Sequence, residues 1–171
     1  MEKIKIYTTS QLFILVILRI LIGWHLLYEG ISKLISPGWS SLGFLKESKW
    51  IFSDLSQWII SNGNVLEAVN FLNTWGLIAI GLGLILGLFT RVAAFSGIIL
   101  LLVYYSMNPP LVGLEYSVPF EGNYLIVSKT LIEAVALMAV AVFPTSLVFG
   151  LDNFVDRYRN RKKEMNNTIP G

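Results

Sequence analysis

The chain has 171 residues, of which 54% are hydrophobic and 14% are charged, with a formal net charge of +2 and a mean hydropathy of +0.65. These values exclude a soluble domain of this size and indicate an integral membrane protein in one domain. Because the chain has no cysteine and one histidine, it cannot perform thiol–disulfide exchange, ligate a metal through cysteine or hold a bis-histidine haem, and we predict no metal or haem.

Four apolar stretches approach the length of about 20 residues that a membrane-spanning helix needs. They are residues 11–35, 72–89, 92–107 and 124–143. The first is too long for a signal peptide and is interrupted by Arg19, so we interpret it as a retained helix. The sequence predicts an all-α, integral membrane four-helix bundle over residues 1–150, followed by a basic tail over residues 151–171.

The first stretch carries four ionisable side chains where lipid would tolerate none: Arg19, His25, Glu29 and Lys33. At about 100° per residue, all four lie within one third of the helical wheel. Each charge at membrane depth costs roughly 2.5 to 3.5 kcal/mol, and such groups normally face a bundle interior or a wet cavity. This polar stripe is therefore a candidate functional site.

The connection that follows begins with Ser36-Pro37-Gly38-Trp39, which ends the first helix. It holds too many large apolar side chains for a solvated loop, and tryptophan is enriched where membrane meets water. We expect short helices on the outer end of the bundle. They form either an aromatic anchor belt or a lid over an outward-facing pocket.

The second stretch is a packing helix, because small residues recur along it at three- and four-residue steps. These residues are Gly76, Ala79, Gly83 and Gly87. Thr90-Arg91 leaves room only for a tight turn, so the second and third helices form an antiparallel hairpin. Pro109-Pro110 ends the region of the third helix, just after Tyr104 and Tyr105. These tyrosines are either interfacial residues or hydroxyl groups that point inward and hydrogen-bond a ligand carbonyl or an oxyanion.

The fourth stretch carries Lys129 and Glu133 one turn apart. Counted from the outer end of the helix, Glu133 lies about 15 Å deep, near the depth expected for Arg19 and His25. A buried charge needs a partner, so we expect an interhelical ion pair between Arg19 and Glu133.

Basic residues indicate the orientation. They precede the first helix, occupy the turn at Arg91 and follow the fourth helix, whereas residues 108–123 contain no lysine or arginine. We expect a multi-pass protein of the cell inner membrane with both termini cytoplasmic. The basic tail is explained by lipid headgroups, and no nucleic-acid partner is expected.

Motifs along nearly the whole chain resemble those of the DoxX/DoxD proteins. They are Arg19-x-x-x-Gly23, Glu29-Gly30-x-x-Lys33, Gly43-Phe44-Leu45, Asn73-x-Trp75-Gly76, Gly83-x-x-x-Gly87-x-x-x-Arg91, Pro109-Pro110 and Gly122-Asn123-x-x-Ile126-x-x-Lys129-x-x-x-Glu133. The resemblance implies a small four-helix membrane protein. It also implies similarity to the membrane subunit of thiosulfate:quinone oxidoreductase, which passes electrons from thiosulfate to membrane quinone and forms tetrathionate.

The resemblance and the polar stripe together favour a quinone-linked oxidoreductase subunit with a small anion at its outer face. The candidate catalytic residues are Arg19, His25, Glu29 and Glu133, and the candidate substrate-binding residues are Lys33, Lys129, Tyr105 and Asn123. Of these, His25 follows from the helical-wheel argument alone. Since no residue here carries electrons, electrons must pass directly to a bound quinone or come through a cofactor or partner subunit.

Two other functions remain open. In the first, the protein is a non-catalytic membrane anchor or assembly subunit whose charges only specify helix packing, alone or as a homo-oligomer. In the second, which we favour least, it is a small-solute transporter, although the sequence shows no evident inverted repeat.

Overall fold

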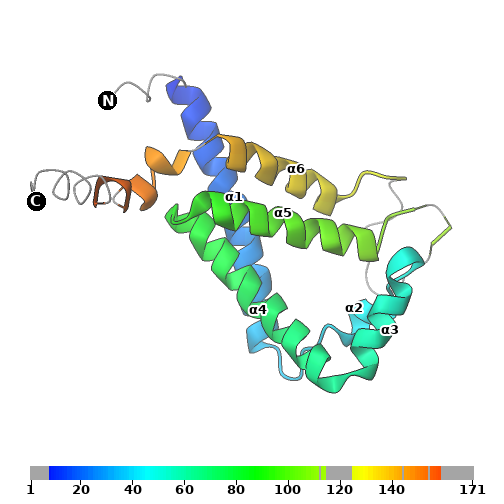
Figure 1. The fold of residues 1–171 in the computed structure, drawn as a ribbon. Helices are drawn as coiled ribbons and strands as arrows, with labels where there is room; N and C mark the ends of the chain where they lie inside the picture. Colours follow the sequence, from blue (N-terminus) through cyan, green and yellow to red (C-terminus); the bar gives the residue numbers. More distant parts are fainter. Residues whose placement is uncertain (1–7, 112, 115–124, 144, 154, 159–171) are drawn as a thin grey trace, which may run out of the picture.

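The computed structural model describes residues 8–111, 113–114, 125–143, 145–153 and 155–158, and these residues form an all-α membrane protein. The predicted fold class is confirmed, including the short helices after the first long one (Figure 1). The elements in chain order are α1 (Thr9–Ile35), α2 (Leu42–Lys46), the 3-10 helix η1 (Trp50–Phe52), α3 (Ser53–Ser61), α4 (Gly63–Leu86), α5 (Thr90–Met107), α6 (Lys129–Val142) and the 3-10 helix η2 (Thr145–Leu147).

Three helices in the described part of the chain are long and apolar enough to cross a membrane: α1, α4 and α5. The fourth, α6, has 14 residues and is therefore about 21 Å long, which is shorter than the hydrocarbon core of about 30 Å. The fourth helix was expected from residue 124, which lies outside the described residues. In the structure it begins at Lys129, where the Ser128 side chain accepts a hydrogen bond from the backbone of Leu131.

The second long helix, α4, begins at Gly63, nine residues before the predicted start. Its first turns contain the polar residues Asn64, Glu67 and Asn70, which lie before the apolar stretch that begins at residue 72. Those turns are helical because Val65, Leu66 and Val69 pack against a small core formed by Leu45, Ile59 and Met107. The early part of α4 thus supports α2 and α3, which lie beside it at one end of the molecule (Figure 1).

Helices α1 and α4 run side by side along a contact surface of small residues. A Cβ at Gly81 would lie 2.6 Å from the backbone nitrogen of Leu27, and one at Gly23 would lie 3.0 Å from the carbonyl oxygen of Gly81. A Cβ at Gly30 would likewise lie 2.9 Å from the backbone nitrogen of Ile78. The predicted packing face of this helix is only partly right, because Ala79 is exposed and Gly76 has nothing within 4 Å of its Cβ position.

The tight turn between α4 and α5 is confirmed, and α5 and α6 then pack against each other (Figure 1). Gly87 ends α4 in the left-handed conformation, with φ of 64°. Buried aliphatic side chains from α1, α4, α5 and α6 form one core, which includes Leu26, Leu77, Leu84, Leu101 and Leu137.

Candidate functional site

The structure contains a cavity of about 440 Å³ near the C-terminal end of α1, which we call the Lys33 pocket. Its described lining residues come from α1, α2, the segment between them, α4 and α5. They are Glu29, Lys33, Trp39, Ser40, Ser41, Gly43, Phe44, Asn73 and Tyr104. Part of the predicted polar stripe of α1 therefore faces a cavity.

The lysine of the pocket lies between a carboxylate and two aromatic rings. Lys33 Nζ is 3.5 Å from Glu29 Oε2, one helical turn away. The same Nζ lies 5.4 Å from the ring centroid of Trp39 and 5.7 Å from that of Tyr104, within the range of cation–π attraction. The Lys33 side chain is 17% exposed and that of Glu29 is 48% exposed. The pocket thus holds a shielded ammonium whose charge Glu29 largely balances.

Hydrogen bonds hold one wall of the pocket against α4. The backbone nitrogen and the hydroxyl of Ser41 both donate to Asn70 Oδ1, at 2.8 and 2.6 Å, and Asn70 Nδ2 donates to Ser40 Oγ at 3.2 Å. On the opposite side, the Phe44 ring meets the Tyr104 ring edge to face at 5.5 Å. These hydrogen bonds and this ring contact fix the walls, so the cavity is preformed.

Two buried oxygen atoms at this pocket lack a hydrogen bond of acceptable geometry among the described residues. They are Asn73 Oδ1 and the Tyr104 hydroxyl, which lie near enough to interact with each other. Buried polar atoms are almost always satisfied, so these two oxygen atoms can serve as hydrogen-bonding groups for a ligand or a water in the pocket.

The expected ion pair between Arg19 and Glu133 is wrong. Glu133 Oε1 instead lies 2.7 Å from His25 Nδ1 and joins α6 to α1. The His25 side chain is 45% exposed, whereas that of Glu133 is 11% exposed. Arg19 lies six residues before His25, which is about 9 Å along α1, so one carboxylate cannot serve both.

Arg19 belongs to a second group of residues, the Arg19 cluster, which comprises Arg19, Gly87, Thr145, Phe149 and Asp152. The buried guanidinium donates to the Phe149 carbonyl at 2.6 Å and to Thr145 Oγ1 at 3.2 Å. A Cβ at Gly87 would lie 3.2 Å from both terminal nitrogens of Arg19. Arg19 thus fastens the segment after α6 to α1, at the opposite end from the Lys33 pocket.

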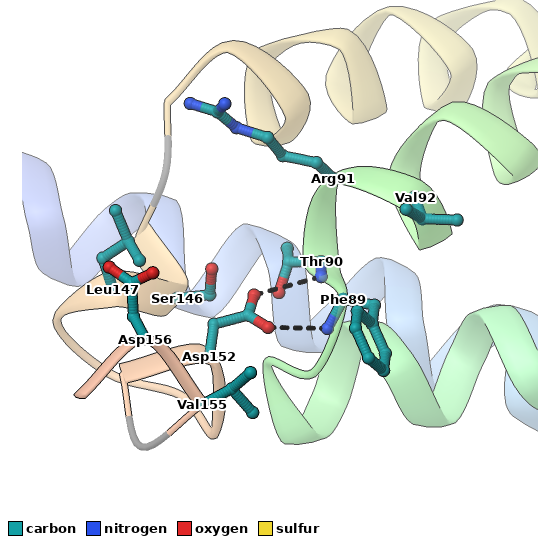
Figure 2. Close-up of a pocket in the computed structure, with 9 residues that line it drawn as sticks. All are labelled: Phe89, Thr90, Arg91, Val92, Ser146, Leu147, Asp152, Val155 and Asp156. Atoms are coloured by element: carbon teal, nitrogen blue, oxygen red, sulfur yellow. Dashed lines mark hydrogen bonds between the residues drawn. The ribbon is translucent and has the colours of Figure 1, made fainter. Parts of the chain in front are cut away.

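Asp152 completes the Arg19 cluster by capping α5 (Figure 2). Its carboxylate accepts hydrogen bonds from the backbone nitrogens of Phe89, at 2.7 Å, and Thr90, at 3.1 Å. Burial alone would raise the pKa of Asp152, but hydrogen bonds from Ser146 and from these two nitrogens outweigh it and lower the pKa below its ordinary value. The backbone nitrogens of Leu151 and Asp152 also bond to the end of α4, so the beginning of the predicted tail packs on the α4–α5 turn.

A second cavity, of about 360 Å³, lies beside this cap. Figure 2 shows Asp152 directed at the start of α5, while Arg91 extends away from it. The polar atoms of Asp152 are thus engaged within the fold. For this reason the Lys33 pocket is the better candidate for binding a ligand.

The other predicted site residues lie apart from the Lys33 pocket. Lys129 is the first residue of α6 and is not among the described lining residues. The Tyr105 hydroxyl donates to the Ile126 carbonyl at 2.7 Å. Asn123 lies outside the described residues. The structure thus brings Glu29 and Lys33 together in one pocket, and His25 and Glu133 together in one hydrogen-bonded pair.

Of the described lining residues of the pocket, the sequence identifies only Glu29 and Lys33 as site residues. The others include Trp39, Asn73 and Tyr104. Trp39 is expected to be interfacial, Tyr104 to be either interfacial or directed at a ligand, and Asn73 enters only within a motif. The signal that could have found Asn73 is its polarity inside the apolar α4, four residues before Leu77, which is 1% exposed.

A comparison with protein families matches residues 14–108 to the DoxX family. This region covers more than half of the chain and includes all the described lining residues of the Lys33 pocket. No curated protein and no solved structure matches the chain. The predicted resemblance is confirmed, and the chain belongs to the DoxX family of proteins.

Proposed function

We propose that this DoxX protein is the membrane subunit of a quinone-linked oxidoreductase and that the Lys33 pocket binds the quinone head group. One observation carries this proposal: a single preformed cavity combines three features. They are aromatic walls, the shielded Lys33 ammonium and the Tyr104 hydroxyl, which has no hydrogen-bond partner of good geometry among the described residues. Quinone supplies two-electron, two-proton chemistry when bound.

The dimensions and chemistry of the pocket suit a planar ring with carbonyl groups. Small-molecule pockets typically enclose about 300 to 1,000 Å³ and combine apolar walls with a few polar groups. The ring of Phe44 can pack on a flat head group, Lys33 Nζ and the Tyr104 hydroxyl can donate to its carbonyl oxygens, and Asn73 Oδ1 can accept from a hydroxyl of the reduced form. Each of these residues lines the same cavity.

A small anion is less well suited to this pocket than the sequence predicts. We expected Lys33 and Lys129 to attract it jointly, but Lys129 is not among the described lining residues. The Glu29 carboxylate lies 3.5 Å from Lys33 Nζ and would repel an anion placed beside the lysine. We therefore propose that an anionic donor such as thiosulfate reacts elsewhere and that its electrons reach the pocket through a partner subunit.

The proposed orientation places the Lys33 pocket on the outer side of the cell inner membrane. The pocket adjoins the last turns of α1, whereas most of the basic residues, including Arg91 and those of the two terminal segments, flank the other end of the bundle. A reporter that is active only outside the cytoplasm should remain silent when fused to residue 171. An active fusion would invert the orientation and place the pocket inside.

Quinone titration of the purified protein in lipid nanodiscs tests the proposed site. Replacing Tyr104→Phe or Lys33→Met should each weaken binding by about 2- to 12-fold, the effect of one net hydrogen bond of about 0.5 to 1.5 kcal/mol. The matched controls are Tyr105→Phe, whose hydroxyl bonds to Ile126, and Lys46→Met, an exposed residue of α2. Both controls should bind quinone as the wild type does.

Failure of the wild type to bind quinone would contradict the proposal and favour the anchor function. The Arg19 cluster supports that alternative, because its charged groups contact only other parts of the same fold among the described residues. Equal weakening in pocket variants and controls would also contradict the proposed site.

A further inference from the structure

We propose that Glu133, His25 and Glu29 form a proton relay that ends at the Lys33 pocket. We call these three residues the His25 relay. The inference rests on the proposed quinone function, since a bound quinone takes up protons only when it is reduced. It assigns a role to the ion pair between α1 and α6, which lies outside the pocket itself.

The three residues lead step by step from α6 to the pocket. Glu133 Oε1 on α6 lies 2.7 Å from His25 Nδ1 on α1. Glu29 follows His25 by four residues on α1, and side chains at this spacing are neighbours on a helix surface. Glu29 also lines the pocket and lies 3.5 Å from Lys33 Nζ. The Glu29 side chain is 48% exposed, so the surrounding protein leaves it room to turn from Lys33 toward His25.

The relay lies at the depth of the membrane-spanning helices, yet two of its side chains are about half exposed. Charged groups at such depth normally face water or a bundle interior, because contact with lipid is costly. Glu133 is one turn, or about 6 Å, from the start of the short helix α6. Water entering beside this helix end would reach the relay without crossing the full bilayer.

The charges around the relay suit proton transfer. His25 faces the carboxylates Glu29 and Glu133, together with the Lys129 ammonium one turn away on α6. Tyr104 of α5 faces Glu29 from within the pocket, and the only titratable residue of α4 is Glu67, in its first turns. Imidazole titrates closest to neutral pH of all side chains, so a histidine between two carboxylates can accept and release protons in turn.

The balance of the proposed reaction requires such a supply of protons. Two thiosulfate ions that couple to tetrathionate form one S–S bond and release two electrons but no proton. Quinone that takes up these two electrons also takes up two protons to become quinol. Both protons must therefore come from water, and the His25 relay would carry them to the pocket from water that enters beside the start of α6.

The competing explanation is that the His25–Glu133 pair only fastens α6 to α1. The variant His25→Asn distinguishes the relay from this explanation. Its amide nitrogen takes the place of Nδ1 and still donates to Glu133, but it does not titrate. Glu133→Gln likewise keeps the shape of the side chain and its hydrogen bond to His25, but it does not titrate. The matched control is Glu67→Gln, an exposed carboxylate of α4.

The test is electrochemical reduction of quinone bound to the purified full-length protein in nanodiscs. A pH-indicator dye records proton uptake, and infrared difference spectra record the protonation of imidazole and carboxylates. In both relay variants, quinone affinity should remain at the wild-type value while proton uptake slows at least about tenfold. Because the chain has one histidine, isotope-labelled histidine assigns the imidazole signal to His25 without any substitution.

Each outcome decides between the two proposals. Quinone binding with wild-type proton uptake in both relay variants would overturn the relay and leave the proposed function standing. A wild-type protein that shows no labelled-histidine signal on quinone reduction would also overturn the relay, even where a variant fails to fold. A wild-type protein that binds no quinone would overturn the proposed function and the relay with it.

Discussion

The two ends of the membrane bundle use polar side chains in opposite ways. In the Arg19 cluster, a buried guanidinium and a carboxylate bond to backbone groups of the α4–α5 turn and of the segment after α6. In the Lys33 pocket, an ammonium, a hydroxyl and an amide oxygen surround a cavity, and the last two lack hydrogen-bond partners of good geometry among the described residues. Arg19 Nε and the nearby Thr90 Oγ1 also lack a hydrogen-bond partner of good geometry among the described residues. The difference between the two ends is therefore that the charged groups of the Arg19 cluster bond to the fold itself, whereas those of the Lys33 pocket line a cavity.

A charge within a membrane helix therefore does not by itself mark a functional site. Arg19 and Lys33 lie on the same face of α1, fourteen residues apart in the sequence. Arg19 is 2% exposed and bonds to two groups of its own fold, so its role is explained by packing. Lys33 lies beside a cavity, so it is available to a ligand.

The largest effect on stability is expected at Arg19. Arg19→Leu leaves the Phe149 carbonyl and Thr145 hydroxyl without their donor, and the loss of the shorter charge-assisted bond alone should cost about 1.5 to 3 kcal/mol. The free energy of unfolding in mixed micelles measures this loss. Arg91→Leu, at an exposed arginine of the α4–α5 turn, is the control and should stay within about 0.5 kcal/mol of the wild type.

Quinone binding by Arg19→Leu tests whether the two ends have separate roles. The folded fraction of Arg19→Leu should bind quinone with wild-type affinity, because Arg19 does not line the Lys33 pocket. Weakened quinone binding with unchanged stability would mean that Arg19 serves the ligand rather than the fold.

The contact between α1 and α4 extends between the two ends. A substitution there should destabilise the protein nearly as much as Arg19→Leu does. Gly81→Ala places a methyl group 2.6 Å from the Leu27 backbone nitrogen, so the helices must separate, at a cost of about 1 to 3 kcal/mol. Gly76→Ala on the same helix meets nothing within 4 Å and should stabilise the helix by up to about 1 kcal/mol. Equal effects of the two substitutions in the same unfolding assay would contradict the close approach of α1 and α4 at Gly81.

A smaller, pH-dependent effect is expected at Asp152. Asp152→Ala removes the cap of α5 and should cost about 1 kcal/mol near neutral pH. Because hydrogen bonding lowers the pKa of this carboxyl, its contribution is complete above the ordinary aspartate pKa and is lost as the pH falls through the lowered value. The difference in unfolding free energy between variant and wild type should therefore shrink in acid.

The control for this prediction is Asp156→Ala, which removes an exposed carboxylate from the same cavity. It should change the unfolding free energy by less than about 0.5 kcal/mol at every pH. A difference for Asp152→Ala that grows as the solution is acidified would show that the carboxylate does not cap α5 in its charged form.

The sequence was sufficient for the membrane class, the tight turn between α4 and α5 and the polar stripe of α1, because apolar length, helix-breaking residues and helical periodicity are local properties. The sequence did not predict which residue pairs with each charged side chain. A helical wheel gives the direction of Arg19 but not the depth at which Glu133 meets α1, so the wrong pair was expected. The Arg19 cluster was missed because its acceptors, Thr145 and Phe149, follow the last long helix, in a segment to which the sequence assigned no helix.

The Lys33 pocket was predicted in part for a similar reason. Glu29 and Lys33 share a helix face, so their spacing identifies them. Trp39, Asn73 and Tyr104 come from three other segments, and only the packing of α4 and α5 in the bundle brings them to the same cavity. Such long-range placement leaves no periodic signal in a single sequence.

Photolabelling with an azidoquinone in native-like lipid, followed by mass-spectrometric mapping, tests most directly whether quinone binds in the Lys33 pocket. We expect labels on the peptides that contain Trp39 to Phe44 and Tyr104, and we expect excess unlabelled quinone to suppress them. Labels confined to the α4–α5 turn and residues 145–153, at the Arg19 cluster, would contradict the account. So would labelling that unlabelled quinone does not suppress.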